Sequence, residues 1–234
     1  MNPAKRTARL AGLLWLLSVV TGGPGLAYIR SNVIVAGNAA VTAGNVRASE
    51  FLFRAAIVGL LFGQVFFFFL GLTLFHLFKE INRRLATVLL ASAMMTVGIA
   101  VVNTLNHFGA LIVLTQADYL KVFTPEQLDG IGMLLLRLGN GIGQGLLEIF
   151  WTPFYFSLGL LSIRSGYLPK IIAILLMMMG IGFAINILDK FLVPQFHPLA
   201  FTRLAMTLGG LGGIPTILWL LIKGVRTQPE VSEA

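Results

Sequence analysis

Residues 54–78 read RAAIVGLLFGQVFFFFLGLTLFHLF, and this stretch decides the fold. A helix crosses the hydrocarbon core of a bilayer with about 20 consecutive apolar residues, which this stretch supplies. Comparable apolar stretches recur along the whole chain. They predict an all-α, polytopic bundle of six transmembrane helices, at residues 9–28, 54–78, 85–114, 128–163, 168–188 and 203–222.

The overall composition excludes an ordinary soluble protein. Of 234 residues, 57% are hydrophobic and 11% are charged, and the mean hydropathy is +0.88. Six spans take up about 120 residues, so no loop has room for a folded domain and residues 1–234 are expected to form a single one. The absence of cysteine excludes disulfides and thiolate metal sites.

The net charge of +8 indicates membrane orientation rather than nucleic-acid binding, because Lys and Arg stand in small groups at the ends of apolar stretches. Cytoplasmic loops retain basic residues, so we expect both termini in the cytoplasm and the protein in the cell membrane. This orientation places ten basic residues inside, Lys5, Arg6, Arg9, Lys79, Arg83, Arg84, Arg164, Lys170, Lys223 and Arg226. It places six outside, Arg30, Arg47, Arg54, Lys121, Lys190 and Arg203.

Three stretches carry local expectations. Residues 9–28 also fit a cleavable signal peptide, but their length favours a retained span, which Gly22-Gly23-Pro24-Gly25 should distort or end near the outer face. The outer loop, residues 30–53, is expected to contain a short helix over residues 39–50 and to act as a passive connector, with a lid as the alternative. Residues 128–163 exceed the bilayer by roughly 20 Å, so their first turns should project outward or tilt.

Small residues at four-residue spacing allow two helices to approach closely. Such pairs occur at Gly59 and Gly63, Gly139 and Gly143, Gly141 and Gly145, and Gly209 and Gly213.

Polar residues inside the apolar spans are the candidates for a site, because burying them in hydrocarbon is costly. Their spacings of three and four residues place them on one helical stripe in each of two spans: Arg137, Asn140, Gln144 and Glu148 in one, and Asn103, Asn106 and His107 in the other. In the predicted orientation both stripes lie in the outer half of the membrane, together with Gln64, Asn186, Asp189, Arg203 and Thr207. We therefore predict an outer polar cavity centred on Glu148, Gln144, Asn103 and His107.

Structural alternatives apply to several of these residues. The Asn and Gln side chains can form hydrogen bonds between helices that hold the bundle together. The long side chain of Arg137 can extend its charged end to the outer interface. For Glu148 a functional role is favoured over a structural one, because a buried carboxyl group must stay protonated or find a cationic partner. His107, Glu148 and Asp189 form a weak candidate for a metal site, but no local metal motif supports it, and no cofactor is expected.

Several segments together resemble the uncharacterised bacterial and archaeal membrane family called domain of unknown function 4386. They are residues 9–14, 36–40 with Thr42 and Asn45, Phe53 and Arg54, 123–128, 158–160 and 164–170. The resemblance covers nearly the whole chain and implies a single six-helix domain, with no established activity, substrate or catalytic residue. This chain has Asn38 where that family more often has Asp, which argues against an acid role there.

Three functions fit these patterns. The first is binding or transport of a small or amphipathic molecule in the cavity, with Glu148 as a protonatable group. The second is an accessory or assembly subunit with a structural polar stripe. The third, ranked last, is a membrane-embedded enzyme that acts on a lipid-like substrate, with Glu148 or His107 as general base. The expected partners are membrane lipids, a small amphipathic ligand and further subunits of the same or another chain, and no nucleic acid.

Overall fold

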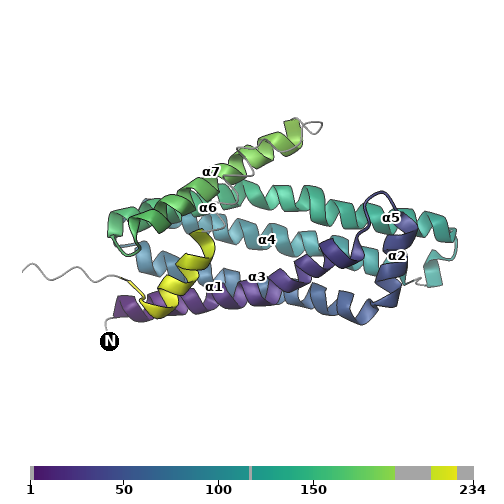
Figure 1. Cartoon of the computed structure of the whole chain (residues 1–234), viewed down its shortest axis with the longest axis horizontal. Helices are drawn as coiled ribbons and strands as arrows, with labels where there is room; N and C mark the ends of the chain where they lie inside the picture. The colour runs from purple at the N-terminus through teal and green to yellow at the C-terminus, as the bar shows by residue number, and fades with distance from the viewer. Residues whose placement is uncertain (1–2, 116–117, 193–211, 226–234) are drawn as a thin grey trace, which may run out of the picture. The chain divides into compact units, whose positions relative to one another are not determined.

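The computed structural model describes residues 3–115, 118–192 and 212–225, and these are helical apart from short connections (Figure 1). No strand occurs in these ranges. The α-helices are α1 Pro3–Tyr28, α2 Ala39–Ala48, α3 Glu50–Phe78, α4 Arg83–Leu114, α5 Pro125–Arg137, α6 Gly143–Ser165, α7 Lys170–Leu192 and an unlabelled helix, Gly212–Ile222. Two π-helical turns, η1 Ile29–Val33 and η3 Leu138–Ile142, and a 3₁₀ turn, η2 Asp118–Leu120, complete the set.

Five helices are long and apolar enough to cross a membrane: Pro3–Val33, Glu50–Phe78, Arg83–Leu114, Pro125–Ser165 and Lys170–Leu192. They leave large apolar side chains exposed, including Val102, Leu105 and Ile171 at 64%, 64% and 69%. Such exposure along whole helices is typical of contact with lipid rather than water. The prediction of an all-α helical membrane protein is confirmed.

The sixth predicted span, residues 203–222, can be assessed only in its second half. Residues 203–211 lie outside the described residues, whereas Gly212–Ile222 forms an apolar helix. The count of six spans and the cytoplasmic termini stay predictions.

The described residues belong to two compact units. Unit 1 comprises those within Met1–Leu16, Phe67–Thr96 and Glu148–Ala234, and unit 2 is formed by Leu17–Phe66 and Val97–Leu147. Several long helices contribute to both. The single domain expected from the sequence stays a prediction.

Aromatic side chains build the core of unit 1. The ring of Phe154 lies 6.4 Å from that of Trp15 and 5.2 Å from that of Phe67, and Tyr155 stacks on Phe183 at 5.7 Å. All five are buried, so α1, α3, α6 and α7 of this unit meet at a single aromatic centre.

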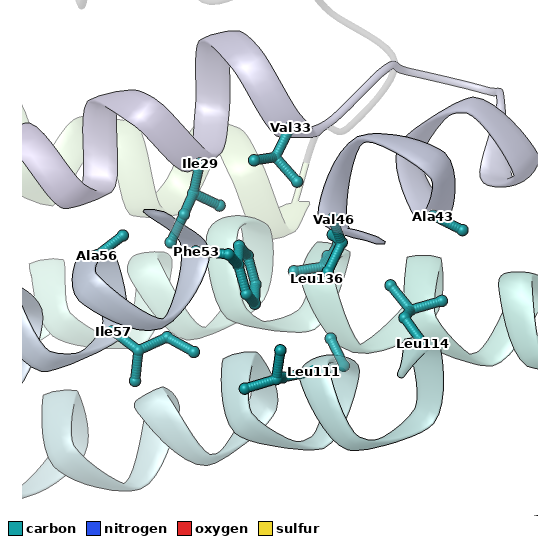
Figure 2. Close-up of a cluster of buried hydrophobic side chains, with 11 residues drawn as sticks. Ile29, Val33, Ala43, Val46, Phe53, Ala56, Ile57, Leu111, Leu114 and Leu136 are labelled. Atoms are coloured by element: carbon teal, nitrogen blue, oxygen red, sulfur yellow. The ribbon is translucent and has the colours of Figure 1, made fainter. Parts of the chain in front are cut away.

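Aliphatic side chains build the core of unit 2. Figure 2 shows Phe53 among neighbours from η1, α2, α4 and α5, in a cluster of Ile29, Val33, Ala43, Val46, Phe53, Ala56, Ile57, Ala110, Leu111, Leu114 and Leu136. The cluster contains four residues of the predicted loop, Val33, Ala43, Val46 and Phe53, whose burial favours a fixed structure for that segment.

The helix expected over residues 39–50 is present as α2, which packs against α5 (Figure 1). Asn38 caps its start by accepting a hydrogen bond from Val41 N at 3.0 Å. Asp performs the same capping, so the choice between Asn and Asp at this position has a structural explanation. Arg47, near the end of α2, donates to the Leu114 carbonyl at 2.9 Å and pairs with Asp129 at 2.6 Å. These contacts favour the passive connector over the lid.

The sequence predicts that Gly22-Gly23-Pro24-Gly25 ends or distorts the first helix near the outer face. The prediction that the helix ends there is wrong. Helix α1 contains Pro24 and continues to Tyr28, and η1 extends it to Val33. The small residues serve a close helix contact instead: a Cβ added at Gly63 of α3 would lie 3.1 Å from the Gly22 Cα. Packing of α1 on α3 therefore outweighs the hydrogen bond lost at Pro24, and close approach at Gly59 and Gly63 is confirmed.

The fourth predicted span, residues 128–163, is not one regular α-helix. It runs from Pro125 to Ser165 and widens into the π-helical turn η3, in which the Gly143 amide donates to the Leu138 carbonyl five residues earlier. Glycine weakens the α-helix, and three of them stand between Leu138 and Gln144. Single π-turns of this kind occur frequently at functional sites.

Candidate functional site

Two groups of predicted polar residues come together in the structure, one in each unit. We call them the α4–η3 group, which comprises Asn103, Asn106, His107 and Asn140, and the α6–α7 group, which comprises Glu148, Asn186 and Lys190.

The α4–η3 group is a hydrogen-bonded network in unit 2. Asn103 Nδ2 donates to the Gly139 carbonyl at 2.9 Å, and Asn106 Nδ2 donates to Asn103 Oδ1 at 3.2 Å. Asn140 Nδ2 lies 3.2 Å from His107 Nε2 and donates to the Leu136 carbonyl at 3.0 Å. The three α4 residues share one face, as their spacing predicted, and that face meets the π-turn.

Glycine in the π-turn makes this contact possible. A Cβ added at Gly139 would lie 3.0 Å from His107 Cε1, and one added at Gly143 would overlap the Asn103 amide. No such obstacle surrounds Gly141, which has nothing within 4 Å of its added Cβ. The pair Gly139 and Gly143 thus does allow close approach, but to polar side chains of α4 rather than to its backbone.

The network leaves two buried polar atoms without a hydrogen bond in the described part of the chain. They are Asn140 Oδ1 and His107 Nδ1, and the His107 side chain belongs to a residue that is 2% exposed. The Asn103 carbonyl lies within electrostatic reach of the His107 ring but forms no well-aligned bond with Nδ1. Because an unsatisfied buried group costs about 1–3 kcal/mol, such atoms call for an explanation.

The hydrogen bonds also fix which of these atoms donates. Asn140 Nδ2 faces two acceptors, the Leu136 carbonyl and His107 Nε2, so Nε2 accepts and the proton of a neutral imidazole resides on Nδ1. The group therefore presents one donor, His107 Nδ1, and one acceptor, Asn140 Oδ1. Arg30 of η1 adds a positive charge close enough to interact with His107.

The α6–α7 group is a buried ion pair in unit 1. Glu148 on α6 is 5% exposed, and its Oε2 accepts from Asn186 Nδ2 at 2.6 Å. Its Oε1 lies 3.6 Å from Lys190 Nζ. Asn186 and Lys190 are four residues apart on α7, so both reach the same carboxylate. A Cβ added at Gly180 would lie 2.8 Å from the Thr152 carbonyl, which shows how closely α6 and α7 approach.

Lys190 is the residue that the sequence missed. The sequence predicts that Glu148 either stays protonated or finds a cationic partner, and it places Lys190 only among the outer basic residues. Its four-residue spacing from Asn186 was the signal that could have identified it.

The other predicted site residues are placed less specifically. Gln64 lies in unit 2, and its Oε1 is buried without a hydrogen bond in the described ranges. Gln144 and Asp189 are half-buried, in units 2 and 1 respectively. Arg137 is exposed, unlike Asn140, Gln144 and Glu148, because η3 interrupts the regular helical stripe immediately after it. Arg203 and Thr207 lie outside the described residues.

Because Glu148 belongs to unit 1 and Gln144, Asn103 and His107 to unit 2, a cavity that they all share stays a prediction. Among residues 3–115, 118–192 and 212–225, no three His, Asp or Glu side chains gather as metal ligands.

The comparisons with known proteins agree with the resemblance in the sequence. The model of the family described as domain of unknown function (DUF4386) matches residues 10–224. No curated protein and no solved structure matches the chain.

Proposed function

The chain belongs to the family described as domain of unknown function (DUF4386), and from that premise we propose that it is a multi-pass protein of the cell membrane that binds a small amphipathic molecule. The α4–η3 group is the proposed binding site, in the outer half of the membrane. The observation that carries the proposal is the pair of buried, unsatisfied atoms on His107 and Asn140.

A ligand would supply the hydrogen bonds that the network lacks. The donor His107 Nδ1 and the acceptor Asn140 Oδ1 are carried by two side chains in direct contact at 3.2 Å. A hydroxyl or a carboxamide carries both an acceptor and a donor, so a ligand with such groups can supply a partner to each of the two atoms. An apolar tail suits the same ligand, because the exposed residues of α4 next to the group, Val102 and Leu105, are apolar.

The local backbone supports binding over a purely structural role. A network that served only to hold helices together would gain by satisfying all its members, since a half-satisfied polar network is worse than an apolar core. The π-turn and its glycines add cost to the helix without closing the network. Features that cost stability are typical of functional sites.

Native mass spectrometry of gently extracted protein tests the proposal. We expect the wild type to retain a specific small molecule that His107→Leu loses. The matched control is His76→Leu, since His76 is exposed on α3 and its ring bonds only its own helix, at the Leu72 carbonyl. Retention in the control and loss in His107→Leu, at equal thermal stability, supports the site and identifies the class of ligand by mass.

Two other outcomes contradict binding at this site. If the wild type carries only exchangeable bulk lipid, the accessory role takes its place, and His107→Leu should then alter the proteins that copurify. If the ligand survives His107→Leu, it binds elsewhere. Transport, as opposed to binding, further requires a ligand-dependent proton flux in vesicles that Glu148→Gln abolishes.

A further inference from the structure

One end of unit 1 gathers basic residues from four separate parts of the chain. The Phe78 ring, at the end of α3, lies 5.8 Å from the Tyr167 ring between α6 and α7. The Tyr167 carbonyl in turn accepts from Trp219 Nε1 of the helix Gly212–Ile222 at 3.3 Å. These contacts place the turn after α3, the turn before α7 and the last helix together.

The start of α1 joins the same end. Arg9 Nη2 donates to the Ile222 carbonyl at 3.0 Å, and Figure 1 shows the yellow last helix beside the start of α1. Gly224 has a φ of 72° and its amide bonds the Trp219 carbonyl at 3.0 Å, which ends that helix. A Cβ added at Gly224 would lie 2.7 Å from Lys5 Cγ, so the turn after the last helix packs closely against Lys5 near the start of α1.

The charge at this end is almost entirely positive. We call the basic residues of these four parts the basic collar: Lys5, Arg6, Arg9, Lys79, Arg83, Arg84, Arg164, Lys170 and Lys223. Among the described residues of the four parts, the single acidic residue is Glu80. It is exposed, and its Oε1 lies 3.9 Å from Lys79 Nζ. Unit 2 differs, because it pairs basic with acidic side chains at Arg47 and Asp129, Arg54 and Glu50, and Lys121 and Asp118.

We propose that the basic collar binds the phosphate headgroups of anionic phospholipids in preference to zwitterionic ones. Six of its residues are exposed, so a headgroup can reach them: Arg6, Arg83, Arg84, Arg164, Lys170 and Lys223. The collar lies at the ends of apolar helices. Tyr167 and Trp219, which contact each other at the same end, are of the residue types that anchor proteins at the level of headgroups. Clusters of Lys and Arg in this setting attract anionic lipid.

The full chain, reconstituted in vesicles of equal parts phosphatidylglycerol and phosphatidylcholine, provides the test. Native mass spectrometry then measures the ratio of anionic to zwitterionic lipid that stays bound. We expect enrichment of phosphatidylglycerol, and a fall of at least about fivefold in the ratio for the double variant Arg83→Gln/Arg84→Gln. The variant Arg83→Lys/Arg84→Lys keeps the charge and should keep the enrichment.

The matched control removes the same charge from unit 2, as Arg54→Gln/Lys121→Gln, and should leave the ratio unchanged. A bound ratio equal to that of the vesicles overturns the proposal. So does an equal loss in the control variant, which would indicate net charge alone, or complete displacement of the lipid by millimolar inorganic phosphate, which would indicate a site for the free anion.

Discussion

In the α6–α7 group, each carboxylate oxygen of Glu148 has a partner, Asn186 for one and Lys190 for the other. In the α4–η3 group, Asn140 and His107 bond each other and still leave one donor and one acceptor unused. Both groups lie within apolar helices, where an unpaired polar atom is costly. The first group is therefore complete within the chain, whereas the second lacks two partners among the described residues, and the proposed ligand would supply them.

The largest expected effect comes from breaking the ion pair. Lys190→Met leaves the Glu148 carboxylate buried with Asn186 alone, and should lower the free energy of unfolding by about 2–3 kcal/mol. This loss is smaller than the roughly 3–5 kcal/mol typical of fully buried pairs, because the Lys190 side chain is 34% exposed and solvent screens its charge. Unfolding in mild detergent measures the loss. The double variant Glu148→Gln/Lys190→Met should recover most of it, and a double variant as unstable as Lys190→Met would show that the pair itself is not the cause.

A smaller effect is expected from closing the space at the π-turn. Gly143→Ala pushes its new methyl group into the Asn103 amide and should cost about 1–3 kcal/mol. Gly141→Ala is the matched control, because it adds the same methyl group where nothing lies within 4 Å. Thermal unfolding of both variants should separate them. Equal stability would mean that α4 and η3 do not pack as described.

The smallest effect on stability is expected within the α4–η3 group itself. Asn140→Leu removes the unsatisfied Oδ1 together with the bonds of Nδ2, so the gain and the loss offset each other and the ligand-free protein should change by less than about 1 kcal/mol. The same variant should lose the bound molecule that we expect in the wild type. A large loss of stability without any ligand would identify the group as structural and remove the contrast between the two groups.

The sequence predicted most of the helical elements, because each depends on local information. The apolar stretches at 54–78 and 85–114 agree with α3 and α4 to within four residues, and the helix predicted over 39–50 is α2. The face shared by Asn103, Asn106 and His107 also followed from spacing alone. By contrast, the prediction that Gly22-Gly23-Pro24-Gly25 ends a helix was wrong. This segment packs closely against α3 at Gly59 and Gly63, which are about forty residues away along the chain.

The candidate site could be predicted in its residue types but not in its pairings. Asn140 meets His107 only because η3 widens the helix, and a single π-turn has no periodic signal. Lys190 meets Glu148 only because α6 and α7 cross at Gly180. A spacing rule relates residues on one helix, whereas these contacts join two.

By itself the sequence determined that this chain is a helical membrane protein of the DUF4386 family, with polar residues placed at a cost inside its apolar helices. Hydrophobic length and helical periodicity are local properties, and they suffice for that conclusion. Only the tertiary structure decided which polar atoms are satisfied. Satisfaction depends on distances of about 3 Å between side chains of different helices, and those distances are set by packing and not by the order of residues along the chain.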